Sequence, residues 1–307
     1  MHGPKKMKRI LPIAVLGVIC GVLFCATVSA RLPELIPYRK GALWGYSDSL
    51  GNIKIACKYT GAEFFANGLA KVELNDKWGF INNAGKTIVP CVFEDARLFS
   101  DGMAVVKLDG KFGFIDKTGK PVVPCVYDRA ENLEDGMAAV RLDKKWGFID
   151  KTGQIVIPCM YKFVTDFNEG LAELWGDKNG FINKEGQQVI PCIYDYTWGF
   201  SEGLAGVKSD GKCGFINRTG KIVIPLIYDD VWFFEYGLSH VTLDGKLGFI
   251  NKAGRLVIPC IYDDVIHLKG MVMVKLDGKW GLANNAGKMI FPCIYDNQIY
   301  FVEVWRQ

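Results

Sequence analysis

The sequence contains few of the residues from which an active site is usually built. Histidine occurs three times in 307 residues, and only His240 and His267 lie beyond the first thirty residues. There is no HExxH zinc motif, no phosphate-binding loop, no nucleophile elbow and no Cys-x-x-Cys pair. We therefore predict that the protein is not an enzyme and that it needs neither a metal nor a cofactor.

An excess of charge is also missing from most of the chain. Lysine and arginine number 37 against 33 aspartates and glutamates, but four of the bases lie in the first thirty residues, which contain no acid. The remaining residues therefore carry 33 bases and 33 acids. A neutral chain of this kind argues against nucleic acid as a partner.

Only one long hydrophobic run is present, and it lies at the N-terminus. Basic residues Lys5 to Arg9 precede the apolar run ILPIAVLGVICGVLF, and the small residues Val28, Ser29 and Ala30 follow it. This layout predicts a signal peptide over residues 1–30, cleavage after Ala30, and a mature domain over residues 31–307. An uncleaved anchor is the alternative, because a spanning helix needs about 17 to 25 residues. Either way we expect a periplasmic, cell-envelope or secreted protein whose only membrane contact would be that anchor.

The dominant feature of the remaining chain is an internal repeat of 33 to 34 residues. Lys77 to Pro90 reads KWGFINNAGKTIVP, and the same pattern returns as KFGFIDKTGKPVVP at Lys111 to Pro124. The glycine of the repeated dipeptide occurs at Gly45, Gly79, Gly113, Gly147, Gly180, Gly214, Gly248 and Gly281. Such a period indicates a tandem-repeat architecture of about eight units.

Each repeat contains three short segments with the character of β-strands. In GMAVVKLD the residues Ala104, Val106 and Leu108 share one face while Val105 and Lys107 share the other, which predicts a strand that ends at the hairpin dipeptide Asp109-Gly110. The second segment is KFGFID, which ends at the turn Lys117 to Gly119, and the third is VVPCVYD. We therefore predict a three-stranded meander in every repeat.

Proline and glycine recur at fixed places in this meander. Pro124 and its equivalents cannot donate a ladder hydrogen bond, so we expect them at a sheet edge or a bulge. The repeated glycine, Gly113 in this repeat, is expected to leave room for an aromatic ring of a neighbouring repeat.

A 34-residue meander is too small to fold alone, so its stability must come from neighbouring copies. Two all-β architectures satisfy this requirement. The first is an open, β-solenoid-like array of three-stranded repeats, which we favour because 34 residues are few for four strands. The alternative is a closed β-propeller. The strand-like segment Ile299 to Trp305 would allow a ring to close by strand exchange.

Cysteine is frequent and holds one place in most repeats. Besides Cys213, the chain beyond the first thirty residues has seven cysteines at equivalent positions: Cys57, Cys91, Cys125, Cys159, Cys192, Cys260 and Cys293. One interpretation is a ladder of disulfides, which export would permit. The other is a small buried side chain, which fits Leu226 at the same place in the sixth repeat.

The combined pattern GLAxVxxDGKWGFIDKTGKxVIPCxYD resembles the WG repeat, also called the KWG repeat, a β-rich unit that occurs in tandem mainly in bacterial proteins. The resemblance covers nearly the whole chain after residue 30. The resemblance implies a repeat scaffold for binding or assembly, and it implies no catalytic activity. Asn179, Cys213 and Leu247 replace the tryptophan in three repeats, which argues against that tryptophan as a binding residue.

The segment after each Tyr-Asp varies most between repeats, and variable loops on a regular frame are where repeat proteins tend to place binding residues. Trp198 and Trp232 share one register there, with Tyr196 and Phe233 beside them. We take these four residues as the candidate ligand-binding site, because exposed aromatic rings suit a protein surface or sugar rings. The alternative is that Trp198 and Trp232 pack beneath the loop between repeats.

These observations predict an exported, non-enzymatic repeat scaffold that mediates protein–protein or envelope interactions. A glycan-binding or cell-wall-binding module is the alternative, and a hydrolase site assembled from several repeats is a third. The partner itself, an unidentified protein or envelope glycan, has no signature in the sequence.

Overall fold

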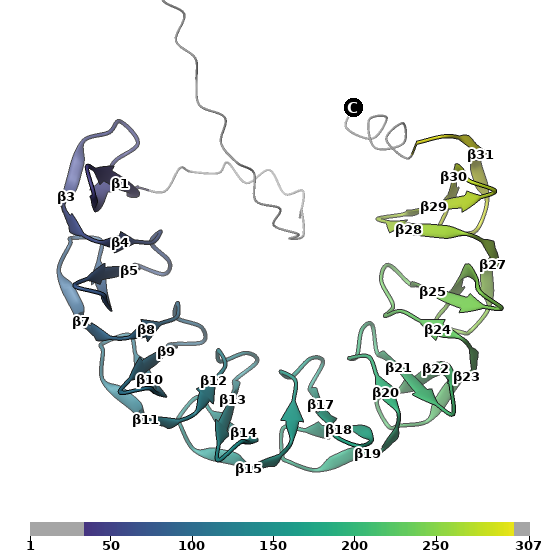
Figure 1. The fold of residues 1–307 in the computed structure, drawn as a ribbon, viewed down its shortest axis with the longest axis horizontal. Coiled ribbons are helices and arrows are strands. Elements are labelled where there is room, and N and C mark those ends of the chain that lie inside the picture. Colours follow the sequence, from purple (N-terminus) through teal and green to yellow (C-terminus); the bar gives the residue numbers. More distant parts are fainter. Residues whose placement is uncertain (1–33, 298–307) are drawn as a thin grey trace, which may run out of the picture.

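The computed structural model describes residues 34–297, which form eight antiparallel β-sheets in an open arc (Figure 1). Residues 34–297 contain no helix. Accordingly, no helix within this range has the length and apolar character needed to cross a membrane. The predicted signal peptide and the segment Ile299 to Trp305 lie outside the described residues.

The chain enters each sheet in order. Sheet 1 contains β1 (Ile36–Lys40), β2 (Leu43–Ser47) and β3 (Ile53–Tyr59). Sheet 2 contains β4 (Gly61–Ala62), β5 (Leu69–Leu74), β6 (Lys77–Asn82) and β7 (Thr87–Phe93). Sheet 3 contains β8 (Asp95–Ala96), β9 (Met103–Leu108), β10 (Lys111–Asp116) and β11 (Pro121–Tyr127).

The middle of the arc follows the same order. Sheet 4 contains β12 (Arg129–Ala130), β13 (Met137–Leu142), β14 (Lys145–Asp150) and β15 (Ile155–Tyr161). Sheet 5 contains β16 (Phe163–Val164), β17 (Leu171–Trp175), β18 (Asn179–Asn183) and β19 (Gln188–Tyr194). Sheet 6 contains β20 (Tyr196–Thr197), β21 (Leu204–Ser209), β22 (Lys212–Asn217) and β23 (Ile222–Tyr228). Sheet 7 contains β24 (Asp230–Val231), β25 (Leu238–Leu243), β26 (Lys246–Asn251) and β27 (Leu256–Tyr262), and sheet 8 contains β28 (Asp264–Leu268), β29 (Met271–Leu276), β30 (Lys279–Asn284) and β31 (Met289–Tyr295).

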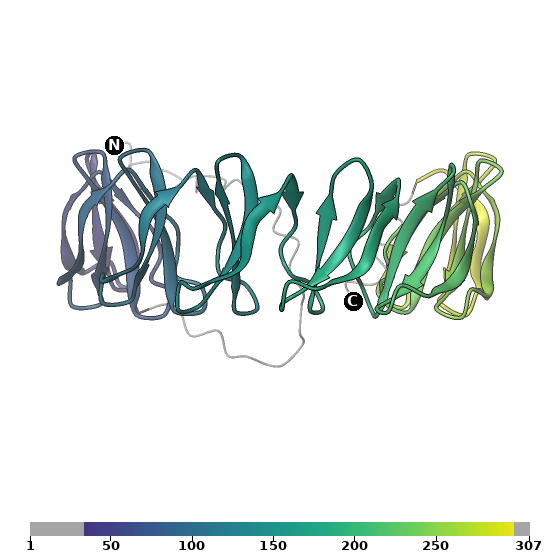
Figure 2. The same cartoon turned by 90° about the horizontal axis from the view of Figure 1, so that it is seen from below.

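The sheets stand side by side in a single layer, as the view from below shows (Figure 2). In each sheet from the second onward the first strand lies toward the centre of the arc and the last strand on its outer edge (Figure 1). The predicted all-β array of eight repeats is confirmed, and its described part is open. The sheets are arranged radially around a common centre, like the blades of a β-propeller.

The prediction of three strands per repeat was incomplete. Sheets 2 to 7 gain a fourth strand of two residues from the variable segment that follows the last strand of the preceding repeat, and sheet 8 gains a fourth strand of five residues. Arg129 and Ala130, for example, pair with Arg141 and Val140. Two residues are too few to show a strand-like alternation in the sequence. Because this strand pairs with the next repeat, it also carries the chain from one sheet into its neighbour.

The turn glycines behave as the sequence predicts. Asp109 and Gly110 have φ angles of 49° and 76°, the pair of positive values that a tight two-residue hairpin requires. Gly119 has φ of 85°, and its amide donates to the carbonyl of Asp116, as in a type I turn followed by a bulge.

The glycine after each tryptophan has a different role from the one we predicted. A Cβ atom at Gly147 would lie 2.4 Å from the carbonyl oxygen of Ile157 and 2.6 Å from the backbone nitrogen of Cys159. Both atoms belong to β15 of the same repeat, where the pairing with β14 shifts register around Pro158. The proline thus lies in a bulge, as expected. The bulged backbone crosses directly over the glycine, so the strand's own partner, and not a neighbouring ring, excludes a side chain.

The hydrophobic core is divided among the spaces between adjacent sheets. Phe215 of sheet 6, for example, belongs to one cluster with Val231 of β24 and with Phe234 in the loop that joins β24 to β25 of sheet 7. Equivalent clusters join every other adjacent pair of sheets. Sheet 8, the last described, adds a small cluster around Met271 and Trp280. Most of the core therefore lies between sheets, which confirms that the repeats stabilise one another.

The cysteines are unpaired thiols in the described structure. The outer strands that carry them belong to separate sheets and do not pair with one another, so a ladder of disulfides between repeats has no geometric basis. Six of the thiols lie at the margin of a core cluster, as Cys159 does beside the cluster of sheets 3 and 4, and Leu226 fills the same place in sheet 6. Cys213 lies inside a cluster. The structure therefore favours the second interpretation, a small side chain that packs at the core, although seven of these eight thiols are only partly buried.

Candidate functional site

The candidate site lies on the short first strands, along the inner side of the arc (Figure 1). In the first strands of sheets 3 to 7 the second residue is buried between sheets, so the residues before and after it point to the opposite face. These flanking residues form a row along the inner side of the arc, which we call the inner rim. Its members in sheets 3 to 7 are Asp95, Arg97, Arg129, Glu131, Phe163, Thr165, Tyr196, Trp198, Asp230 and Trp232.

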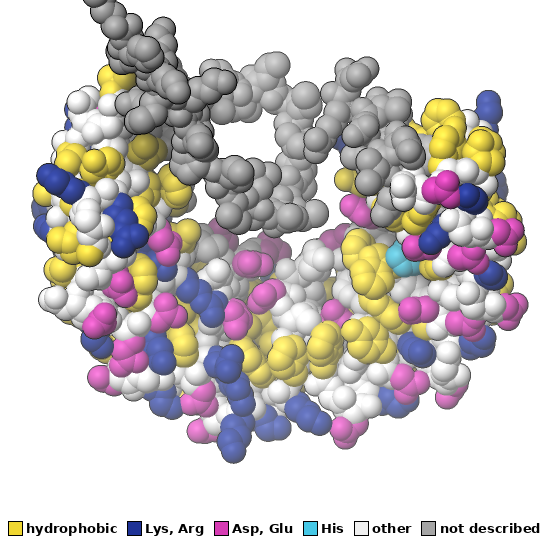
Figure 3. All heavy atoms as spheres, turned by 45° about the horizontal axis from the view of Figure 1, so that its top comes forward, with side chains coloured by type: hydrophobic (Ala, Val, Ile, Leu, Met, Phe, Trp, Pro, Cys, Tyr) yellow, Lys and Arg dark blue, Asp and Glu magenta, His cyan; other side chains and the backbone are white. Residues whose placement is uncertain are grey.

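The chemistry of the inner rim changes along the arc. In sheets 3 and 4 it is ionic, and the guanidinium of Arg97 lies 2.7 Å from the carboxylate of Glu131. In sheets 5 to 7 four of its six members are aromatic, and the other two are Thr165 and Asp230. Figure 3 shows hydrophobic side chains gathered in a row in the middle of the arc.

The aromatic rings of sheets 4 to 6 form a continuous series of contacts. The centroids of Trp146 and Phe163 lie 6.0 Å apart, and Phe163 stacks on Trp175 at 5.3 Å. Trp175 then lies 6.2 Å from Tyr196, which meets the edge of Trp198 at 4.8 Å. We call Phe163, Trp175, Tyr196, Trp198, Trp232 and Phe233 the aromatic rim. Phe163 is 43% exposed and Tyr196 is 44% exposed, so the series presents ring surface to solvent across two sheet boundaries.

A buried carboxylate lies beneath these rings. Glu173 is only 7% exposed, and its Oε2 atom accepts hydrogen bonds from Trp175 Nε1 and Thr197 Oγ1. Burial raises the pKa of Glu173, and the two hydrogen bonds oppose that rise. The carboxylate thus holds the Trp175 ring against the neighbouring sheet.

A pocket of about 430 Å³ opens beside the first rings of the aromatic rim. Trp146 and Phe163 line it together with Arg129, Glu131 and Asp166. Burial raises the pKa of Asp166, and the neighbouring carboxylates of Glu134 and Glu131 raise it further, against the effect of Arg97. Ring faces and polar groups therefore meet in one concave site.

A second, smaller pocket of about 200 Å³ lies between sheets 7 and 8, and we call it the Trp232 pocket. It is lined by Trp232, Phe233, Glu235, His240, Val265 and His267. The rings of Trp232 and His240 are nearly parallel, with centroids 5.6 Å apart. Burial lowers the pKa of both histidines, so both are neutral at pH 7. Within residues 34–297 no three metal-ligating side chains gather at one point.

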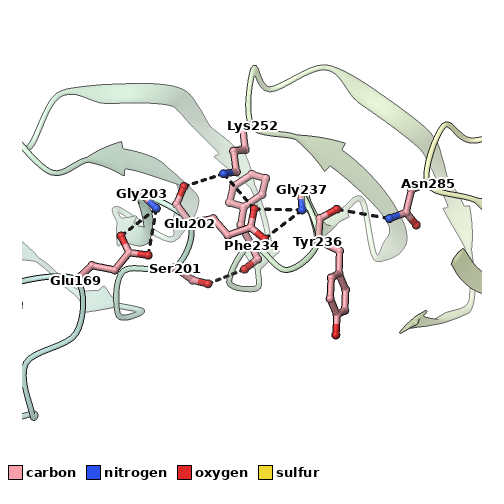
Figure 4. Close-up of polar contacts among 9 residues, drawn as sticks. All are labelled: Glu169, Ser201, Glu202, Gly203, Phe234, Tyr236, Gly237, Lys252 and Asn285. Atoms are coloured by element: carbon pink, nitrogen blue, oxygen red, sulfur yellow. Dashed lines mark hydrogen bonds and ion pairs between the residues drawn. The ribbon is translucent and has the colours of Figure 1, made fainter. Parts of the chain in front are cut away.

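Hydrogen bonds between successive loops hold the inner rim in place (Figure 4). The carboxylate of Glu202 accepts from the amide of Gly237, one repeat later, and lies 3.1 Å from Lys252 Nζ. Glu169 accepts in the same way from Gly203, and Ser201 donates to the carbonyl of Phe234. Residues about one repeat apart in the chain are thereby joined, which fixes each loop relative to the next.

The four residues predicted from the sequence lie on this surface, but not equally. Trp232 is 46% exposed and Phe233 is 39% exposed, and both line the Trp232 pocket. Tyr196 is exposed, whereas Trp198 is half-buried and packs against the core cluster of sheets 6 and 7. The sequence reasoning missed Phe163, although it occupies the same position in its repeat as Tyr196. It also missed Trp175, which reaches the rim from β17, outside the variable segments.

Comparison with known families agrees with this repeat geometry. Eight segments match the family model described as the WG containing repeat: residues 44–78, 78–112, 112–146, 146–173, 180–213, 214–246, 248–280 and 280–303. The chain belongs to the WG-repeat family. The tryptophan that names the family serves packing here: Lys71 Nζ lies 4.2 Å from the ring centroid of Trp78, and Trp146 contacts Phe163 of the next sheet.

Similarity to individual proteins is weak. No curated protein matches the chain. A eukaryotic initiation factor structure is 10% identical with a TM-score of 0.45, and the match covers 84% of this chain and 85% of that one. Hsv2p of Kluyveromyces lactis is 12% identical with a TM-score of 0.35, over 62% of this chain and 73% of that one. PorZ of Porphyromonas gingivalis, a bacterial surface component of a secretion system, is 8% identical with a TM-score of 0.30, over 77% of this chain and 38% of that one. At these values the matches carry no functional argument.

Proposed function

We propose that this WG-repeat protein is an exported, non-enzymatic scaffold that binds a protein or envelope component through its aromatic rim. The observation that carries the proposal is the set of partly exposed rings on this rim, which consists of the contacting series from Phe163 to Trp198 and the separate pair Trp232 and Phe233. Exposed aromatic rings that lie together are typical of interaction surfaces, because each ring buries a large apolar area with little loss of side-chain freedom. The loop hydrogen bonds support the proposal, since a rigid surface loses less entropy on binding.

The experiment is a capture of partners from envelope extracts with residues 31–307 and with the double variant Trp198→Ala, Trp232→Ala. The matched control is Ile193→Ala, Ile227→Ala, which removes two exposed apolar side chains from the outer strands β19 and β23. We expect the aromatic variant to lose a partner that the wild type and the control retain. Equal recovery of every partner by all three proteins would contradict the proposal.

Export is a separate part of the proposal and has its own test. Expression of the full chain in a bacterium, followed by mass spectrometry of the protein from the envelope and medium, should find Arg31 as the first residue. Recovery of uncleaved protein in the membrane fraction would support the anchor instead, and recovery in the cytoplasm would contradict export.

A glycan-binding module is the second candidate, and the pocket beside Phe163 favours it. Sugars present apolar C–H faces and hydroxyl edges, and this pocket offers two ring faces with Arg129, Glu131 and Asp166 around them. Titration with cell-wall oligosaccharides should then quench or shift the tryptophan fluorescence. An unchanged spectrum at millimolar sugar would count against this candidate.

A further inference from the structure

The Trp232 pocket differs from the pocket beside Phe163 because no lysine or arginine among the described residues lines it, whereas Arg129 lines the other. Its walls combine two partly exposed rings, Trp232 and Phe233, with the carboxylate of Glu235. A volume of about 200 Å³ suits a single side chain. A ring face carries negative electrostatic potential, and so does a carboxylate, so both attract a positive charge.

The charges around the pocket are also negative on balance. Glu235 and Glu202 act on His267, and Asp230 acts on His240. Lys252 pairs with Glu202, but no described residue forms an ion pair with Glu235 or Asp230. Among residues 34–297, no lysine or arginine lines the pocket. Within the described residues, the pocket lining thus contains the carboxylate of Glu235 and no cation, and the only cation paired nearby, Lys252, is already matched by Glu202.

The two histidines fit the same character. Because burial favours the neutral imidazole, neither adds a positive charge that would repel a cation. A neutral imidazole also keeps one nitrogen as an acceptor. The Nε2 atom of His267 is buried and has no hydrogen-bond partner within residues 34–297.

We propose that the Trp232 pocket receives a lysine or arginine side chain from a partner protein, which lays a basic peptide segment along the aromatic rim. This inference rests on the proposed function and adds the chemistry of the partner. The charge complementarity favours a basic peptide over a neutral glycan, because only the peptide gains an attraction to the exposed carboxylate of Glu235.

The test is fluorescence anisotropy with residues 31–307 and a labelled peptide, about ten residues long, of alternating lysine and glycine. The same peptide with acetylated lysines removes the charge and keeps the length, and a glutamate–glycine peptide reverses the charge. We expect the lysine peptide to bind, the other two to bind at least about tenfold more weakly, and affinity to fall as salt rises.

Variants locate the binding within the protein. Trp232→Ala and Glu235→Gln should each weaken binding of the lysine peptide by about 2-fold to 30-fold, the range expected for cation–π and exposed charge contacts. Trp232→Phe keeps a ring and should retain most of the affinity, which separates loss of the contact from loss of folding. Ile227→Ala on the outer strand should bind as the wild type does.

Several results would overturn the inference. The first is that the acetylated and the charged peptides bind equally well. The second is that Trp232→Ala and Glu235→Gln bind the lysine peptide as tightly as the wild type does. The third is that the lysine peptide does not bind at all. A hexasaccharide of N-acetylglucosamine that shifts the tryptophan fluorescence, when the lysine peptide does not, would assign the rim to glycans. In each case the capture experiment with Trp198→Ala, Trp232→Ala still decides separately whether the rim binds a partner.

Discussion

The glycine that follows each tryptophan offers the sharpest test of the repeat geometry. Alanine at Gly147 would place a methyl group 2.4 Å from the carbonyl oxygen of Ile157, about 1 Å inside the 3.4 Å at which ordinary contact begins. The obstacle is backbone, so no side-chain rotation relieves it. Strand β15 must move away from β14, which strains the packing by about 1–3 kcal/mol and weakens ladder hydrogen bonds worth about 1 kcal/mol each. We therefore expect a total loss of about 3–5 kcal/mol.

Gly136→Ala provides the matched control in the same sheet. Gly136 has φ of +81°, and a Cβ atom added there would have no heavy atom within 4 Å. Its substitution therefore carries only the left-handed backbone penalty of about 1–2 kcal/mol. With about 2–4 °C per kcal/mol for a chain of this size, Gly147→Ala should lower the melting temperature by roughly 6–20 °C and the control by roughly 2–8 °C.

Thermal unfolding and hydrogen exchange measure this difference. Because neighbouring repeats stabilise one another, we expect faster exchange in sheet 4 and its two neighbours in the Gly147→Ala protein, with sheet 8 little changed. If Gly147→Ala melts at the same temperature as Gly136→Ala, the bulged outer strand does not cross over the glycine and this account of the repeat is wrong.

Three further predictions concern packing, the loop contacts and the buried acid. Phe215→Ala removes a fully buried ring between sheets 6 and 7 and should lower the free energy of unfolding in urea by about 3–5 kcal/mol. Hydrogen exchange should become faster only in that part of the arc. Equally faster exchange along the whole chain would argue against stabilisation of each repeat by its immediate neighbours. Glu202→Gln weakens a solvent-exposed contact to Lys252 and should cost less than about 1 kcal/mol, an effect that must shrink at high salt if it is electrostatic. Glu173→Gln keeps both hydrogen bonds, because both donors bind one oxygen, and removes the buried charge. Because the pKa of Glu173 in the folded protein is raised above its ordinary value of 4.5, the wild type loses stability as the pH rises from that value. The variant should therefore be more stable than the wild type near pH 8 and no more stable near pH 4. An equal difference in stability at both pH values would refute the raised pKa of Glu173.

Much of the fold follows from short-range patterns in the sequence. The 34-residue period, the alternating apolar residues and dipeptides such as Asp109-Gly110 specify three strands and their turns, because hairpin pairing depends on residues close together in the chain. The prediction that repeats depend on one another also followed from their size alone.

The inner rim was only partly predictable. Trp198 and Trp232 share a register that the sequence shows directly. Trp175 belongs to a different strand, and only the pairing of β16 with β17 brings it beside Phe163. Similarly, His240 and His267 come from β25 and β28, and only the packing of sheet 7 on sheet 8 places both beside Trp232.

The sequence by itself determined the repeat, its strands and its family, because these depend on local turn chemistry and on a period that can be counted. The tertiary structure alone decided the open arc, the fourth strand, the state of the cysteines and the pockets of the inner rim. These depend on how one sheet packs on the next, through contacts between residues that the chain separates by a full repeat.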